Sequence, residues 1–214
     1  MTARPGVFLV FEGGDGVGKT TQVGRLCAEL VAAGHEVVRT FEPGDTALGS
    51  SIRRIVLDPA TGDLAPRAEA LLYAADKAQH LHEVVLPALA RGAVVVCDRY
   101  VDSLLAYQGA GRVLDLAELE QIARWVTQSV RPDLTVVLDV EPQRAVQELV
   151  DKDRLEAAGD SFHLRARQLF LELARRNPDR YLVLDARLSR DAIAARVAAR
   201  VRPILSQPSG TLGP

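Results

Sequence analysis

Apolar residues along the chain fall into two patterns that alternate with each other. Five short runs are rich in apolar and β-branched residues, as expected for strands of a buried parallel sheet. These runs are residues 7–11, 36–41, 93–97, 134–140 and 181–185. Between them, apolar residues recur every three or four positions, which is the spacing of an amphipathic helix. The alternation predicts βαβ units and therefore an α/β domain around a parallel sheet.

Several residues predict where helices begin, and one predicts a disturbance. Thr46, Asp115 and Ser189 each precede an apolar-periodic segment, and residues of these types cap the first helical turn. Pro87 lies near the end of a long helical segment, so we expect it to kink or weaken the last turn. Residues 98–112 are a polar, glycine-containing segment between a strand and the helix that Asp115 begins.

Length and composition indicate one domain. The chain has 214 residues, of which 48% are hydrophobic, and this is enough for the core of one compact unit. It shows no internal repeat and no linker, so we expect a single domain over residues 1–205. Residues 143–160 include a charged stretch with a glycine and are expected to form a lid. Residues 206–214 are rich in Pro, Gly and Ser and are expected to be a disordered tail.

Charge and residue usage narrow the classes of partner. The net charge is −2, whereas proteins that bind duplex nucleic acid are usually more basic. No segment approaches the roughly 18 consecutive apolar residues of a membrane span, and residues 1–6 do not begin a signal peptide. Two cysteines and four histidines show neither disulfide nor metal-ligand spacing. We therefore expect a cytoplasmic protein with no nucleic-acid and no membrane partner.

The strongest chemical signal is a glycine-rich turn between the first strand and the first helix. It matches the pattern G-x-x-x-x-G-K-[ST], in which glycines let backbone N–H groups converge on phosphate oxygens at a helix N-terminus. Lys19 would supply a charge between the β- and γ-phosphates of ATP, and Thr20 would bind Mg²⁺. The predicted nucleotide-binding residues are Gly13, Gly14, Asp15, Gly16, Val17, Gly18, Lys19, Thr20 and Thr21.

Further acidic residues follow the predicted strands. Asp98 and Arg99 come directly after one strand and Glu42 ends another, and ligands bind at the carboxyl ends of parallel strands. Asp98 is placed to orient hydrated Mg²⁺, and Arg99 is placed to hold a phosphate through two hydrogen bonds. Asp15 has two open interpretations: it holds a sugar hydroxyl or a metal-bound water of a second substrate, or it is a solvated turn residue.

Several segments together resemble bacterial thymidylate kinases over residues 8–201. They are FEGGDGVGKTTQ, FEPGDTALGSSIRRIVLD, AEALLYAADKAQH, CDRYVDSLLAYQGAGR, RPDLTVVLDV and DRLE, in this order. The phosphate loop alone is common to many nucleotide-binding proteins, whereas the later segments are far more specific. The resemblance implies a P-loop kinase fold with a five-stranded parallel sheet of order 2-3-1-4-5, flanked by helices, usually as a homodimer. It implies transfer of the ATP γ-phosphoryl group to dTMP with Mg²⁺.

The resemblance also implies roles for single residues. Asp15 would hold the deoxyribose 3′-hydroxyl, Arg53 and Arg99 would hold the dTMP phosphate, and Glu42 would line the dTMP and metal region. Tyr73 would stack on thymine, and Tyr107 would crowd the sugar 2′ position. Three more residues would contact the base, namely Lys77, Ser103 and Gln108. The metal ligands expected on this basis are Thr20, Asp98 and Glu42.

The sequence departs from the family pattern at three places. Phe41 occupies a position where many relatives have Arg, and Lys77 replaces an Arg whose planar fork selects the base. The lid is poor in arginine, and Gly16 means that the phosphate loop has none. We therefore expect Arg154 to supply the cation that stabilises the transition state. The alternatives are Arg165 and Arg167.

Three other functions compete with this interpretation. The nearest is another nucleoside monophosphate or deoxynucleoside kinase, which a panel of acceptors would distinguish. The second is a nucleotide-dependent switch, but a GTPase should have an N-K-x-D motif, which is absent from the sequence. The third is a catalytically weak nucleotide-binding protein, which the arginine-poor lid would favour.

Overall fold

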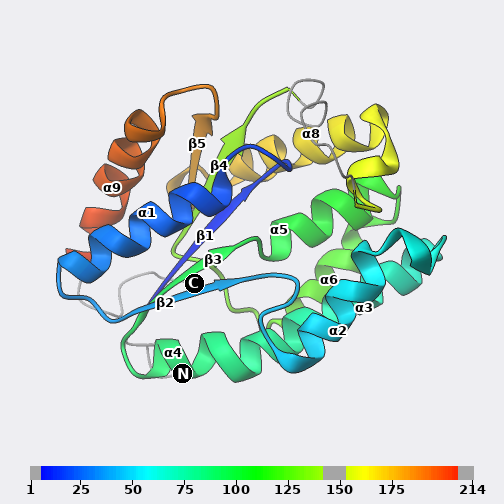
Figure 1. The fold of residues 1–214 in the computed structure, drawn as a ribbon, viewed down its shortest axis with the longest axis horizontal. Helices are drawn as coiled ribbons and strands as arrows, with labels where there is room; N and C mark the ends of the chain where they lie inside the picture. Colours follow the sequence, from blue (N-terminus) through cyan, green and yellow to red (C-terminus); the bar gives the residue numbers. More distant parts are fainter. Residues whose placement is uncertain (1–5, 142–152, 207–214) are drawn as a thin grey trace.

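The structure is a computed structural model that describes residues 6–141 and 153–206. Five strands form one parallel sheet of order β2-β3-β1-β4-β5, as the resemblance implied (Figure 1). Their bounds are β1 Val7–Gly13, β2 Val37–Phe41, β3 Val94–Asp98, β4 Leu134–Asp139 and β5 Tyr181–Asp185.

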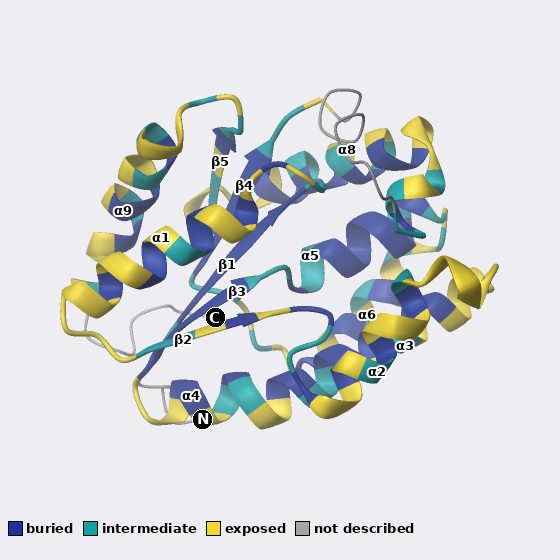
Figure 2. Cartoon of the chain, viewed as in Figure 1, coloured by how far each residue is buried: buried dark blue, intermediate teal, exposed yellow. Residues whose placement is uncertain are grey.

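Helices cover both faces of the sheet (Figure 1). The described helices are α1 Lys19–Ala32, α2 Ala47–Leu57, α3 Pro66–His80, α4 Leu86–Ala90, α5 Val101–Leu104, α6 Leu116–Val126, α8 Asp160–Arg176 and α9 Arg190–Ser206. Leu9 of β1 packs with Val23 of α1 and Val197 of α9 on one face. Val10 packs with Leu89 of α4 on the other, so the central strand is buried on both sides (Figure 2).

The register of the sheet gathers the ends of three strands. Asp98 at the end of β3 pairs with Phe11 of β1 on one side and with Phe41 of β2 on the other. The phosphate loop follows β1, and the Glu42 turn follows β2. All three segments therefore lie at the carboxyl edge of the sheet, where ligands bind in open α/β folds.

The segment over residues 98–112 is mostly helical. It contains α5 and a wider π-helical turn over Leu105–Gly111. Its glycines are explained by close contacts rather than by a loop. A Cβ atom at Gly109 would lie 2.4 Å from Leu116, and one at Gly111 would lie 2.5 Å from the Phe162 ring. The glycines let this segment pack against α6 and α8.

The expected disturbance at Pro87 is present. Proline lacks an N–H group and clashes with the carbonyl four residues earlier, so it weakens or kinks a regular helix. A π-helical turn over Leu81–Val85 separates α3 from α4, and Pro87 is the second residue of α4. The predicted caps are also confirmed: the Thr46 hydroxyl accepts from the Gly49 N–H at 2.8 Å, and the Asp115 carboxylate from the Glu118 N–H at 2.9 Å.

Two expected segments lie partly outside the described residues. Most of the expected lid falls in residues 142–152, and its described end contains a short turn over Glu156–Ala158. The expected tail begins at Ser206, but this residue is the last of α9, and residues 207–214 lie outside the described part. Within residues 6–141 and 153–206, none of the helices combines the length and the apolar character needed to cross a bilayer.

Candidate active site

The phosphate loop depends on glycine at specific positions. Gly13 has a φ of +131°, and a Cβ atom there would lie 2.3 Å from the Leu138 carbonyl oxygen. Gly18 has a φ of +92° and directly precedes α1, whose N-terminus is capped by no side chain of residues 6–141 and 153–206 and whose first turn contains no acidic residue. The first N–H groups of α1 are therefore available to an anion, and the helix dipole favours one there.

Lys19 lies folded over this loop. Its side chain is 7% exposed, and its ammonium group donates to the carbonyls of Gly13, at 3.1 Å, and Gly14. Burial, together with the nearby Arg99 guanidinium, lowers the Lys19 pKa to about 8. Negative charge placed beside the ammonium would raise this pKa, so a bound phosphate would favour the charged form.

Thr20 and Asp98 meet at the same edge. The Thr20 hydroxyl donates to an Asp98 carboxylate oxygen at 2.7 Å. Across residues 6–141 and 153–206, no three His, Cys, Asp or Glu side chains come together as a ready-made metal cluster. One hydroxyl and one carboxylate fit Mg²⁺, which is usually held by one or two carboxylates with water and substrate phosphates.

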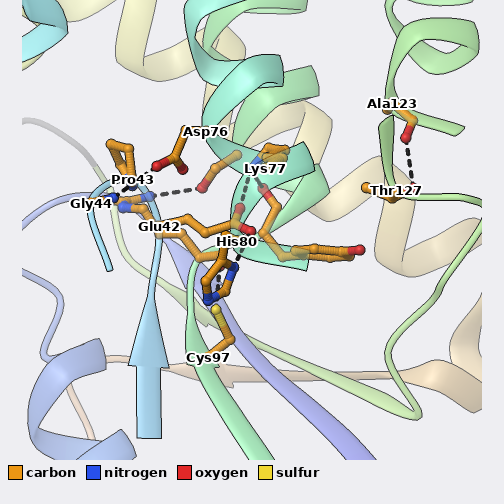
Figure 3. A network of polar contacts seen from close by, with 12 residues as sticks. Glu42, Pro43, Gly44, Asp76, Lys77, His80, Cys97, Ala123 and Thr127 are labelled. Atoms are coloured by element: carbon orange, nitrogen blue, oxygen red, sulfur yellow. Dashed lines mark hydrogen bonds and ion pairs between the residues drawn. The ribbon is translucent and has the colours of Figure 1, made fainter. Parts of the chain in front are cut away.

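The structure places Glu42 differently from the expected metal ligand (Figure 3). It is 3% exposed, and one carboxylate oxygen accepts from the Lys77 ammonium. The other lies 2.7 Å from His80 Nδ1. Burial alone would raise the Glu42 pKa, but Lys77 and His80 hold it below its usual value. Both oxygens are thus engaged by the protein, so in this conformation Glu42 orders the turn rather than facing a metal.

Lys77 belongs to the same buried cluster of paired side chains as Glu42 and His80. Its ammonium also donates to the Tyr100 carbonyl at 2.7 Å and lies 5.6 Å from the centre of the Tyr100 ring. The expected contact with the base therefore does not use a free cation. His80 belongs to the same cluster and matches no local sequence motif, because its partners, Glu42 and Thr40, are distant along the chain.

Arg99 lies at the centre of the site. Its backbone has a φ of +72°, a region that is costly for a residue with a side chain and is often found at functional sites. Its guanidinium donates to the Gly13 carbonyl and the Ser103 hydroxyl, each at 3.0 Å, and pairs with the Asp15 carboxylate. Burial would raise the pKa of Asp15, but Arg99 and Lys19 together outweigh burial and hold that pKa below its usual value. Asp15 is thus an ion-paired residue facing Tyr107, whose hydroxyl lies 3.3 Å away.

Glu12 holds the backbone that follows Arg99, and no local sequence pattern pointed to it as a site residue. It is fully buried, and its carboxylate accepts from the backbone N–H groups of Tyr100 and Ser103 and from the Ser103 hydroxyl. These bonds fix the start of α5 and the strained turn at Arg99. The sequence shows only a polar residue at the end of β1, and its partners lie far along the chain.

One cavity beside Arg99 brings together all of the residues that the resemblance assigned to the acceptor. They are Asp15, Glu42, Arg53, Tyr73, Lys77, Arg99, Ser103, Tyr107 and Gln108. Leu155 also lines it. Arg53 donates to the Pro43 carbonyl at 2.8 Å, which ties α2 to the turn after β2. We call this the acceptor cavity.

A second cavity, of about 480 Å³, adjoins the phosphate loop. Lys19, Thr20 and Asp98 line it, together with Arg39, another residue that the sequence analysis did not select. Arg39 and Phe41 lie two residues apart on β2 and therefore share a face of the strand. We call this the phosphate cavity; four residues line both cavities, namely Asp15, Glu42, Arg53 and Arg99.

The catalytic role of Arg154 stays a prediction, and in this structure its side chain is engaged by other residues of the protein. Its guanidinium pairs with the Glu69 carboxylate and donates to the Val56 carbonyl at 3.0 Å. The Glu69 carboxylate is fully buried, and Arg154 is one of the cations that balance its charge in this structure. The alternatives are engaged as well: Arg165 binds the carbonyls of Ala110 and Gly111, and Arg167 binds the Asp139 carboxylate with two hydrogen bonds.

Comparisons with known proteins show which family the chain belongs to. The sequence model of the family described as thymidylate kinase matches residues 11–197. The chain belongs to the thymidylate kinase family. A Cutibacterium acnes protein named thymidylate kinase is 57% identical over 202 residues, which cover 94% of this chain and 99% of that protein. A Deinococcus radiodurans protein of the same name is 51% identical over 199 residues, covering 92% and 96%.

A solved structure of this family has the same fold. The thymidylate kinase from Ehrlichia chaffeensis superposes with a TM-score of 0.75 at 32% identity, covering 92% of this chain and 99% of that one. The chain is therefore a nucleoside monophosphate kinase of the P-loop type, and the two cavities at the carboxyl edge of the sheet are its candidate donor and acceptor sites.

Proposed function

We propose that this chain transfers the γ-phosphoryl group of ATP to dTMP, giving ADP and dTDP. The observation that supports this most directly is the shared wall of the two cavities. Arg99, Arg53 and Asp15 line both the phosphate cavity and the acceptor cavity, so donor and acceptor phosphates would meet beside the same cations. Holding two reactants in line is the main requirement of phosphoryl transfer.

The proposed reaction needs no covalent intermediate. An oxygen of the dTMP phosphate attacks the γ-phosphorus, and the bond from that phosphorus to the β–γ bridging oxygen breaks with its electron pair leaving on ADP. Lys19 would bind the β- and γ-phosphates, and Arg99 would fix the attacking phosphate and cover charge on the transferring group. Mg²⁺, held by Thr20 and Asp98, would supply further charge neutralisation.

We assign selection of the sugar to Tyr107 and Asp15. The Tyr107 ring is buried, and its hydroxyl donates to Asp15 at the wall of the acceptor cavity. Burial keeps the Tyr107 pKa above its usual value, so the phenol remains a hydrogen-bond donor. A ring in this place would crowd a 2′-hydroxyl, while Asp15 would accept from the 3′-hydroxyl.

A panel of acceptors tests the proposed function. ADP formation from Mg²⁺–ATP would be measured with dTMP, dUMP, dGMP, dCMP, UMP, AMP or no acceptor. Turnover with dTMP far above that with every other acceptor is expected. Equal or greater turnover with another nucleotide would replace dTMP by that acceptor, and turnover independent of any acceptor would leave only an ATPase.

We also propose that the chain forms a homodimer through α2, α3 and α6. These helices pack side by side, and each has an exposed apolar side chain, namely Ile55, Leu71 and Trp125. Light scattering coupled to size exclusion should give twice the chain mass, and Leu71→Asp should reduce it to the monomer mass. A monomer in the unaltered protein would contradict this assembly.

A further inference from the structure

A buried carboxylate at Glu69 lies behind the base-contacting end of the acceptor cavity. Glu69 is on α3, one helical turn before Tyr73, and has no solvent-exposed surface. Its oxygens accept from Gln108 Nε2 at 3.1 Å and from the Arg112 guanidinium at 3.0 and 3.1 Å, and they pair with Arg154. The carboxylate thus joins α3 to two other segments: the helical stretch that contains Gln108 and Arg112, and the stretch that contains Arg154.

The two arginines keep this carboxylate ionised. Burial would raise the Glu69 pKa, but hydrogen bonds from Arg112, Gln108 and Arg154 lower it below its usual value. An ionised carboxylate has only acceptor positions and cannot donate a hydrogen bond. Any amide placed against it must therefore turn its nitrogen, and not its oxygen, toward it.

This requirement fixes the orientation of Gln108. The side chain is 1% exposed and lines the acceptor cavity. One of its amide hydrogens goes to Glu69. Its carbonyl oxygen accepts no hydrogen bond from the residues the structure describes, and its second amide hydrogen has no acceptor among them. Gln108 can therefore offer the cavity one acceptor and one donor in a fixed order.

We propose that Glu69 is a specificity-determining residue that fixes the Gln108 amide so that the site binds 4-oxo pyrimidines and rejects 4-amino pyrimidines. This inference rests on the proposed function. A thymine or uracil edge presents an N3–H donor and an O4 acceptor, which match the Gln108 oxygen and the remaining N–H. A cytosine edge presents an N3 acceptor and a 4-amino donor, so the amide would have to turn over.

Turning the amide over is opposed by Glu69. The Gln108 oxygen would then face the buried carboxylate oxygen, and two acceptors without a proton between them repel each other. Lys77 does not replace this selection, because its ammonium is engaged by Glu42 and the Tyr100 carbonyl. Base discrimination in this chain is thus assigned to Gln108 and to the charge behind it.

The test compares dTMP with 5-methyl-dCMP, which differ at the N3 and 4 positions of the base but both have the 5-methyl group. In Glu69→Gln, the new amide can donate as well as accept, so both orientations of Gln108 become possible. The ratio of kcat/KM for dTMP over 5-methyl-dCMP should fall by roughly tenfold or more, mainly because use of 5-methyl-dCMP rises. An unchanged ratio would overturn the inference.

Arg112→Gln is the matched control. It removes two hydrogen bonds to Glu69 but leaves Arg154 to keep the carboxylate ionised. Both kcat/KM values should fall in parallel, with the ratio retained. A merely structural role of Glu69 predicts the same parallel loss in Glu69→Gln, so the change in preference separates the two roles.

A second measurement needs no variant and remains decisive if Glu69→Gln does not fold. In 3-methyl-dTMP the N3–H donor is replaced by a methyl group, and the unaltered protein should use it with a kcat/KM roughly 100-fold lower than that of dTMP. Equal use would overturn the assigned Gln108 orientation. Failure of the unaltered protein to phosphorylate dTMP at all would instead refute the proposed function, so the two failures are distinguishable.

Discussion

The donor and acceptor halves of the site are built in different ways. The donor half is a run of neighbouring residues whose backbone supplies most of the groups, with glycine required at Gly13 and Gly18. The acceptor half joins residues from the turn after β2, from α2 and α3, and from the helical segment after β3. It is held by buried charge pairs, such as Glu42–Lys77 and Glu69–Arg112.

This difference predicts different responses to mutation. A backbone cradle keeps its shape when a side chain changes, so a donor-side substitution should alter activity with little effect on stability. A wall made of paired side chains should lose both activity and stability when one of them is replaced, because the charge of its partner then stays buried without a counter-charge.

The largest effect on activity is expected for Lys19→Met. The substitution removes the ammonium that would bind the β- and γ-phosphates, and kcat/KM for ATP should fall by about 10³-fold. The melting temperature should change little, because the bonds it loses are to loop carbonyls. Arg25→Met, on the exposed side of α1, is the control and should retain activity. A loss below tenfold in Lys19→Met would remove Lys19 from the donor half.

The largest effect on stability is expected for Glu42→Gln. It leaves Lys77 buried with no carboxylate, which should lower the free energy of unfolding by about 3–5 kcal/mol in urea denaturation. Glu36→Gln, which breaks an exposed pair with Arg91 next to the same strand, should cost under about 1 kcal/mol. Combining Glu42→Gln with Lys77→Met should recover part of the loss. Equal costs for the two single variants would show that the buried Glu42–Lys77 pair does not hold the acceptor half together.

A smaller effect on activity is expected for Arg99→Lys. The charge remains, but the planar fork that joins Gly13, Ser103 and Asp15 is lost. The kcat/KM for dTMP should fall by roughly 10²-fold, whereas the dissociation constant of ATP, measured by calorimetry, should change by less than about threefold. Equal losses for both substrates would mean that Arg99, which lines both cavities, binds the donor as strongly as the acceptor.

The smallest effect is a pH dependence on the donor side. The Lys19 pKa is lowered to about 8, so the charged ammonium disappears as the pH rises through 8. The kcat/KM for ATP should therefore decline above pH 8, while kcat should decline only at higher pH because bound phosphates favour the charged lysine. A kcat/KM profile that stays flat to pH 10 would show that Lys19 does not titrate in this range.

The same difference explains what the sequence could predict. The phosphate loop was identified from neighbouring residues, since its chemistry depends on local backbone conformation. The five strands followed from apolar runs, and the sheet order followed from the family resemblance. The acceptor residues were likewise found only through the resemblance, because no local pattern places Tyr73 beside Arg99.

Other features were beyond local patterns altogether. Glu12, Glu69 and His80 are single polar residues that belong to no local motif, and their importance comes from partners far along the chain. Arg154 was assigned to the phosphates because its motif shows a cation but not the buried carboxylate on α3 that it pairs with. Helix formation over residues 98–112 was not indicated, because its glycines serve packing rather than a turn.

The fate of the γ-phosphoryl group tests the central claim most directly. ATP labelled at the γ-phosphate would be incubated with the protein, Mg²⁺ and dTMP, and the products would be separated and their label counted. The label is predicted to appear in the β-phosphate of dTDP, in amounts equal to the ADP formed. Label that appears in inorganic phosphate, with no labelled dTDP, would contradict transfer to dTMP and leave the chain as a nucleotide-binding protein that hydrolyses ATP.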